Sequence, residues 1–179
     1  MRRNGGRSNW HDRGVIALHL LRHAHAGDAM RWTGNDDVRP LSEKGIRQSE
    51  RLGRLLAGFD EAPDVCITSP RLRASQTAEI VARALDARVV VDERLAQPLD
   101  LAAIEAILGD AGRADRPCLV GHDPDFSEML GDLLGLSAVP MRKGAIARVD
   151  VPDRHLVAGD GILRYLLPPE LLPGKHSNV

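Results

Sequence analysis

The chain has 179 residues, of which 43% are hydrophobic, 27% are charged and only 3% are aromatic, and its formal net charge is −1. This length suits one domain, and the composition excludes a fibrous or disordered protein and predicts a core of Leu, Val, Ile and Ala. The balanced charge excludes a broad basic surface for nucleic acid or anionic membranes, and no apolar stretch approaches the ~20 residues that cross a bilayer.

The N-terminal stretch MRRNGGRSNWHDRG is basic and glycine-rich, and no apolar segment typical of a signal peptide follows it. We therefore expect residues 1–13 to form a flexible tail and the protein to be cytoplasmic. Cys66 and Cys118 lie in the short apolar runs DVCITS and RPCLVGH. They are expected to be small buried residues in a reducing compartment, without a disulfide.

Short apolar runs alternate with segments of helical periodicity along the chain. Ser42 and Asp100 are expected to cap two of the helices, and Ile46, Ser49, Gly53 and Leu56 recur at helical spacing in the first of them. The expected strands are 15–21, 64–69, 87–92 and 117–122, and the expected helices lie within 40–59, 71–85, 99–108 and 125–134. Two more strands, 145–151 and 161–167, complete the chain.

Four successive strand–helix units predict an α/β fold, because neighbouring parallel strands need crossover connections. We expect a three-layer sandwich with a mainly parallel central sheet, helices on both faces and antiparallel strands at the C-terminal end. A single domain over residues 14–168 is expected, and residues 169–179 are expected to form a frayed tail.

Polar residues follow three of the expected strands, and this is where ligands bind in such sheets. Arg22 and His23 end the first strand, TSPRLRASQTA follows the second, and His122 and Asp123 follow the fourth. Two guanidinium groups brought into one crevice would repel each other unless a dianion lay between them, and their donors match phosphate oxygens. A neutral histidine there can attack phosphorus, and a second, if protonated, can stabilise the equatorial oxygens.

Each of these residues also has a simpler interpretation. In GHDP, Asp123 would cap the following helix and Pro124 would occupy its first turn. The stretch HAHAGD is close to a zinc-binding pattern, and His23 and His25 would share one face of a strand. Zinc needs three or four ligands, however, and the closing histidine is absent here, so we expect no metal. His25 is expected to lie near the mouth of the pocket or simply in solvent.

The motifs LRHAHAG, RPLSEKGIRQSERLG, ITSPRLRASQTAEIVA, CLVGHDP and MRKGAIARVDV cover most of residues 18–151. Their order and spacing resemble those of the histidine phosphatase superfamily, and of its small phosphohistidine phosphatase (SixA-type) branch in particular. The resemblance implies that His23 is the phosphorylated nucleophile, that Arg22 and Arg73 hold the phosphoryl oxygens, and that His122 completes the pocket. Arg39 matches a position at the rim, and Arg71 is expected to be secondary.

Two positions depart from the family pattern. Ala24 replaces the usual glycine of Arg-His-Gly, so the backbone there must keep a negative φ. Gln97, in DERLAQP, stands where many relatives carry a glutamate that protonates an alcohol leaving group. Gln97 can contact substrate but cannot donate a proton in this way, and Asp123 and Glu93 are the substitute acids to consider. A leaving imidazole, with a conjugate-acid pKa of about 6.5, needs less help than an alkoxide.

The sequence therefore predicts a metal-independent phosphatase without cofactor, working through a covalent phosphohistidine at His23. The expected substrate is phosphohistidine on a protein of the phosphorelay or phosphotransfer type, and a monomer with an open site is expected. A phosphatase for a small phosphorylated metabolite is the main alternative. A phosphoglycerate mutase, a metal-dependent hydrolase and a non-catalytic module that binds phospho-ligands are the others.

Overall fold

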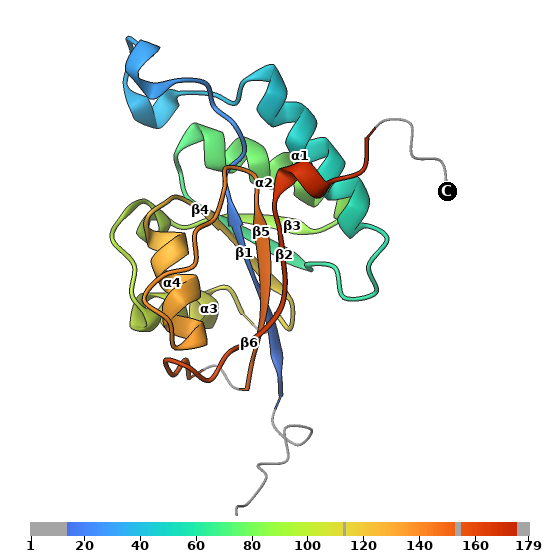
Figure 1. The fold of residues 1–179 in the computed structure, drawn as a ribbon, viewed down its shortest axis with the longest axis vertical. Helices are drawn as coiled ribbons and strands as arrows, with labels where there is room; N and C mark the ends of the chain where they lie inside the picture. The colour runs from blue at the N-terminus through green and yellow to red at the C-terminus, as the bar shows by residue number, and fades with distance from the viewer. Residues whose placement is uncertain (1–13, 113, 153–154, 175–179) are drawn as a thin grey trace, which may run out of the picture.

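The structure, a computed structural model, describes residues 14–112, 114–152 and 155–174, and its centre is one sheet of six strands (Figure 1). The strand order is β3-β2-β4-β1-β5-β6. The first four strands pair in parallel, β5 is antiparallel to β1, and β6 is antiparallel to β5. The strands are β1 (Ile16–Arg22), β2 (Val65–Thr68), β3 (Arg88–Val91), β4 (Pro117–Gly121), β5 (Ile146–Val151) and β6 (Ile162–Leu167).

Helices cover both faces of this sheet, so the expected α/β sandwich with antiparallel strands at its C-terminal end is confirmed (Figure 1). One face packs against α1 and α2, and the other against α3 and α4. The helices are α1 (Glu43–Leu56), α2 (Leu72–Leu85), α3 (Leu101–Asp110) and α4 (Asp125–Leu134). No helix in the described part of the chain is both long enough and apolar enough to span a membrane.

Successive side chains of a strand point to opposite faces of the sheet, so the core is divided into two halves. Leu18 and Leu20 of β1 point to the core under α3 and α4, whereas Leu21 points to the core under α1 and α2. Cys66 and Cys118 pair across β2 and β4 on the second side, and both are buried free thiols, as expected. Because both faces are covered, the strands are apolar on both sides, which is why they stand out in the sequence as short hydrophobic runs.

Most helix boundaries follow the expected signals. The side chains of Ser42 and Asp100 accept hydrogen bonds from the first turns of α1 and α3, which confirms both caps. Of the residues that recur at helical spacing in α1, Ser49, Gly53 and Leu56 are buried, whereas Ile46 is 40% exposed and Gly45 is buried beside it. A side chain at Gly45 would collide with the carbonyl oxygen of His25, so α1 can lie against the loop after β1 only with glycine there.

The two expected tails fall largely beyond the described part of the chain. Residues 1–13 and 175–179 lie outside the described residues. Within the expected C-terminal tail, Pro169–Leu171 form a short 3₁₀ turn, and Leu172 is buried in the core beside α1. Apolar burial of Leu172 holds this segment against the domain.

Candidate active site

The carboxyl ends of β1, β2 and β4 bring the candidate residues to one edge of the sheet. β4 lies between the other two strands. The backbone N–H of His23 donates to the carbonyl of Gly121 at 3.0 Å, and that of Ser69 donates to the carbonyl of Val120 at 3.0 Å. His23, Ser69 and His122 therefore leave three adjacent strands at the same level, as the fold rule predicts for a ligand site.

His23 is held as a neutral imidazole with one nitrogen presented to the pocket. Its side chain lies 2.7 Å, through Nδ1, from the carbonyl oxygen of Ala24. Because a carbonyl only accepts, Nδ1 carries the proton and Nε2 keeps its lone pair. Burial, reinforced by the charges of Arg73 and Arg22, lowers the pKa of His23 to about 3. Ala24 keeps a negative φ, as required, since Asp86 is the only non-glycine residue with positive φ among those described.

His122 faces His23 across the pocket, and their ring centroids lie 5.2 Å apart. Its Nε2 and the hydroxyl of Ser69 are 2.9 Å apart. Burial, together with the charge of Arg73, lowers the pKa of His122 to about 3, so it is neutral here rather than protonated. Ser69 was not singled out from the sequence, because only the pairing of β2 with β4 brings it to His122.

Arg73 is the cation closest to His23. It lies in the first turn of α2, is 4% exposed, and its Nε is 3.3 Å from Nε2 of His23. Thr77, one turn later, accepts a hydrogen bond from the N–H of Ala24 and donates to the carbonyl of Arg73. The helix therefore fixes both the guanidinium and the loop that carries the histidine.

Arg22 approaches from the end of β1. Its guanidinium donates to the carbonyl of Met141 at 2.5 Å and lies 3.3 Å from the carboxylate of Asp123. Its Nε, like Nδ1 of His122, is buried and has no hydrogen-bond partner among the described residues. Buried donors of this kind are costly unless a ligand satisfies them, and an oxyanion would do so.

Asp36, which the sequence did not indicate as a site residue, binds the guanidinium of Arg73. Its carboxylate lies 3.0 Å from Nη2 of Arg73, and its backbone carbonyl accepts from Nη1 at 2.7 Å. Arg39, expected at the rim, is instead buried and holds the same carboxylate at 2.7 Å. The two cations keep the pKa of Asp36 below its usual range. Asp36 thus orients Arg73, and a bound anion would compete with it.

The candidate acids are placed unequally. Asp123 was expected to cap α4, but its carboxylate pairs with Arg22 and accepts from the hydroxyl of Ser127, because these partners outcompete the helix N–H groups. Glu93 and Gln97 are both exposed; Glu93 begins a short 3₁₀ turn after β3 and Gln97 follows its end. Ala96, next to Gln97, accepts a hydrogen bond from Arg71. The structure thus places this turn beside Arg71 and does not join Gln97 or Glu93 to His23 by a hydrogen bond.

His25 does not share partners with His23 but contacts residues of α1 and its cap. Its Nδ1 is 2.7 Å from the hydroxyl of Ser42, and its backbone N–H donates to Gln48 at 3.0 Å. His25 therefore ties the loop after β1 to the start of α1 rather than lying free in solvent. Within the described residues, no group of three or more His, Cys, Asp or Glu side chains is arranged to hold a metal ion.

Lys143 adds a positive charge that the sequence interpretation missed. Burial and the charges of Arg22, Arg39 and Arg73 lower the pKa of Lys143, and Lys143 in turn lowers that of His23. Four cationic side chains therefore act on one small volume. Its position in MRKGA is far from the other motifs in sequence, and only the pairing of β5 with β1 brings it there.

We expect the free energy of unfolding to decrease as the pH falls from 6.5 towards 3. Burial lowers the pKa of His19 to about 4, and those of His23 and His122 to about 3. Below pH 6.5 the unfolded chain binds protons that the native state excludes, so the free energy of unfolding decreases as the pH falls. At pH 5 each of these histidines costs ~2 kcal/mol. Urea denaturation at pH 7.5, 6 and 5 measures this dependence.

The matched variant for this measurement is His19→Gln, which removes one buried group outside the candidate site. The free energy of unfolding of this variant can be lower at every pH. Its slope against pH should correspond to about one proton fewer taken up on unfolding than in the wild-type protein. A free energy of unfolding that stays constant from pH 7.5 to pH 5 would show that the three histidines titrate normally.

Comparisons with known proteins point to one family of enzymes. The model of the histidine phosphatase superfamily (branch 1) matches residues 18–98. An uncharacterised protein of Picosynechococcus sp. is 36% identical over 116 residues, which cover 63% of this chain and 70% of that protein. The 8-oxo-(d)GTP phosphatase of Mycolicibacterium smegmatis is 29% identical over 160 residues; these cover 84% of this chain but only 48% of that protein.

The fold has a similar solved counterpart. The protein histidine phosphatase SixA, solved in complex with tungstate, superposes with a TM-score of 0.73 at 26% identity. The superposition covers 88% of this chain and 100% of that one. The similarity to this structure thus extends over nearly all of the described residues, beyond the part matched by the family model.

Proposed function

This chain belongs to the histidine phosphatase superfamily, a family of phosphatases, and we propose that it hydrolyses phosphohistidine on a protein through a covalent phosphohistidine at His23. In the proposed reaction, Nε2 of His23 attacks phosphorus, the N–P bond of the substrate breaks, and water later opens the new N–P bond. Arg22 and Arg73 hold the phosphoryl oxygens throughout, and His122 lies across the pocket from the nucleophile. Neither a metal nor a cofactor is required for these steps.

One observation carries this proposal: a neutral His23, with Nε2 unprotonated, lies 3.3 Å from the guanidinium of Arg73 within a ring of cations. An imidazole that titrated normally would be partly protonated at neutral pH and would lose its nucleophilic lone pair. Binding alone would not require that lone pair, which argues against a non-catalytic module. The tungstate in the SixA structure is a tetrahedral oxyanion, and an oxyanion bound beside His23 would satisfy the buried Nε of Arg22.

The choice of an N–P bond depends on the leaving group. An alkoxide needs a proton from a nearby acid, and Gln97 stands where the family carries that acid. The carboxylate of Asp123 is already engaged, since it lies 3.3 Å from Arg22 and accepts from the hydroxyl of Ser127. A phosphohistidine that carries a proton on its other ring nitrogen releases neutral imidazole when the N–P bond breaks, because the bonding electron pair stays on the departing nitrogen. The ring takes this proton from solvent near neutral pH, so no acid of the protein is needed and phosphohistidine is the substrate that this set of side chains serves best.

A parallel assay tests the substrate class. The purified protein is offered free phosphohistidine, a histidine-phosphorylated protein, phosphoserine and a sugar phosphate, each with and without EDTA. We expect kcat/KM to be highest for the phosphorylated protein and unchanged by EDTA. Faster hydrolysis of the sugar phosphate would support the small-metabolite alternative, which the similarity to 8-oxo-(d)GTP phosphatase also raises. Loss of activity in EDTA would contradict a metal-independent mechanism.

Changing Gln97 to glutamate is expected to shift this selectivity. A carboxyl group at the turn beside Arg71 can protonate an alcohol, so hydrolysis of alkyl phosphates should rise ~10-fold or more relative to phosphohistidine. The ratio of the two kcat/KM values is the measurement, because it cancels changes in the amount of active protein. Glu93→Gln is the control, since it removes a carboxylate from the same turn and should leave the ratio unaltered. A ratio that stays the same in Gln97→Glu would contradict the leaving-group argument.

The cytoplasmic location, the monomeric state and the extent of the domain over residues 14–168 stay predictions. They do not enter the mechanism, which depends on residues of one chain.

A further inference from the structure

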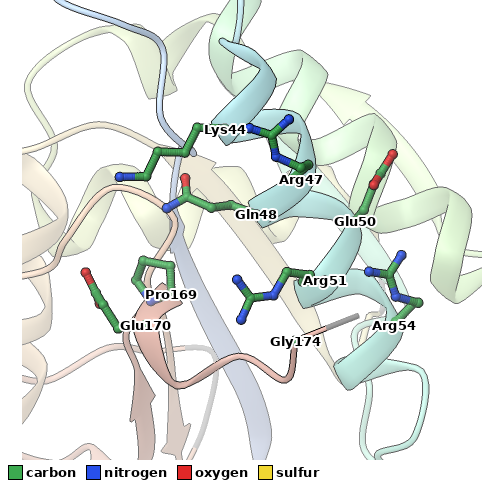
Figure 2. A pocket seen from close by; sticks show the side chains of 9 residues that line it. All are labelled: Lys44, Arg47, Gln48, Glu50, Arg51, Arg54, Pro169, Glu170 and Gly174. Atoms are coloured by element: carbon green, nitrogen blue, oxygen red, sulfur yellow. The ribbon is translucent and has the colours of Figure 1, made fainter. Parts of the chain in front are cut away.

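The outer surface of α1 and the segment 169–174 enclose a groove of about 380 Å³ that contains none of the catalytic candidates (Figure 2). Figure 2 shows Lys44, Gln48 and Arg51 on the side of α1 that faces Pro169 and Glu170. The opposite wall is fixed in place, because Arg51 donates to the carbonyl of Pro173 at 2.8 Å. The groove is therefore a built feature of the fold and not a gap beside a loose end.

The groove is strongly basic in a chain that is not. Lys44, Arg47, Arg51 and Arg54 recur at intervals of three and four residues along the exposed face of α1 and line the groove, against two carboxylates. The net charge of the whole chain is −1, so this positive charge is local. Glu43 and Glu50 stand four residues before Arg47 and Arg54, but the four cations outnumber these acids on this face and repel one another.

Little in the described part of the chain neutralises these cations. Lys44 and Arg54 form no ion pair with any described residue, and Arg47 has only an exposed contact with Glu43 at 3.4 Å. Exposed pairs of this kind contribute little. Arg51 is bound by backbone carbonyls, which leave its charge uncompensated. A ligand with several negative charges would therefore be favoured in the groove.

The groove also abuts the catalytic loop. Gly144 donates its N–H to the carbonyl of His23 at 3.0 Å, and a Cβ on Gly144 would lie 3.5 Å from Gln48 and 3.6 Å from Pro169, which both line the groove. Gln48 in turn accepts from the N–H of His25. A chain lying along α1 would therefore start beside the residues that carry the nucleophile.

We propose that this groove binds an acidic segment of the phosphorylated protein whose phosphohistidine enters the catalytic pocket, an inference that rests on the function proposed above. Lys44 and Arg54 are ten residues apart on α1, so the row of cations extends over ~15 Å. That length corresponds to about five residues of extended chain. Because the groove begins beside the loop that carries His23, an acidic segment continuous with the phosphorylated protein can reach both sites at once, which favours a polypeptide over a separate nucleic acid.

Two synthetic peptides test the inference. Each carries one histidine phosphorylated with phosphoramidate and a short Gly-Ser spacer, followed by a run of glutamates in one peptide and of glutamines in the other. We expect the wild-type protein to hydrolyse the glutamate peptide with a kcat/KM about tenfold higher at low salt. This preference should disappear in about 0.5 M salt, where the charges are screened.

The variants Arg47→Glu and Arg54→Glu should each reduce the preference, and the double variant should abolish it, while hydrolysis of free phosphohistidine stays unchanged. Arg83→Glu is the matched control: Arg83 is an exposed arginine in the last turn of α2, just as Arg54 is in the last turn of α1. Glu50→Gln should increase the preference, because it removes a carboxylate from the groove. Equal losses in Arg54→Glu and Arg83→Glu would overturn the inference.

Fluorescence anisotropy with the unphosphorylated peptides separates this inference from the proposed function. Preferred binding of the glutamate peptide without hydrolysis of either phosphopeptide would support the groove and refute the substrate. Hydrolysis of both phosphopeptides with equal efficiency would support the substrate and refute the groove. A single-stranded oligonucleotide of the same charge that binds more tightly than the glutamate peptide would also refute it.

Discussion

Replacing His23 by alanine is expected to lower kcat/KM by at least ~10³-fold, because the covalent route is lost and water must attack the substrate directly. The buried imidazole is neutral and hydrogen-bonded through Nδ1, so Nε2 of the proposed nucleophile is unprotonated at neutral pH. The measurement combines steady-state hydrolysis of phosphohistidine with intact mass after rapid quenching. The wild-type protein should gain the mass of one phosphoryl group, and His23→Ala should gain none.

His155→Ala is the control for this experiment, because His155 is exposed and its ring lies 2.9 Å from Glu105, outside the candidate site. It should retain both the phosphoryl adduct and the activity. Thermal unfolding of His23→Ala should remain cooperative, because His23 lies outside the two main hydrophobic clusters and its removal leaves them intact. Activity of more than a few per cent in a folded His23→Ala protein would refute the assignment of the nucleophile.

The fold was predictable because its signals are local. Strands covered on both faces are short apolar runs, and helix caps such as Ser42 and Asp100 depend on residues three positions away. The helical spacing within α1 fits two adjacent faces and does not show which of them is buried. The close approach of His25 to Gly45 decides between them, and this contact is tertiary.

The site was predictable only in part, because some of its contacts are also tertiary. The ends of parallel strands meet at one edge, so His23, Arg22 and His122 could be expected to gather there. Asp36 could not, since it reaches Arg73 through two 3₁₀ turns whose path no sequence spacing encodes. Asp123 was misinterpreted because a local rule favoured helix capping, whereas Arg22 is a stronger partner for a carboxylate.

The guanidinium of Arg73 allows a second large effect to be predicted. It contacts Nε2 of His23 through Nε, while Nη1 and Nη2 bind Asp36. A phosphoryl group arriving at Nε2 must lie against this fork and draw it away from the carboxylate. Two parallel donors match two phosphoryl oxygens, and this match improves as charge spreads over the oxygens in the transition state.

Arg73→Lys is therefore expected to lower kcat/KM for phosphohistidine by ~10²–10³-fold, although the charge is retained, because an ammonium group cannot replace the fork. Single-turnover formation of the phosphoryl adduct and inhibition by tungstate should both weaken. Arg71→Lys is the matched control: Arg71 lies two residues earlier, pairs with Asp37 at 3.1 Å, and makes no contact with His23 among the described interactions. If Arg73→Lys stayed within tenfold of the wild-type protein, only the charge of Arg73 would matter, and the bidentate arrangement would be wrong.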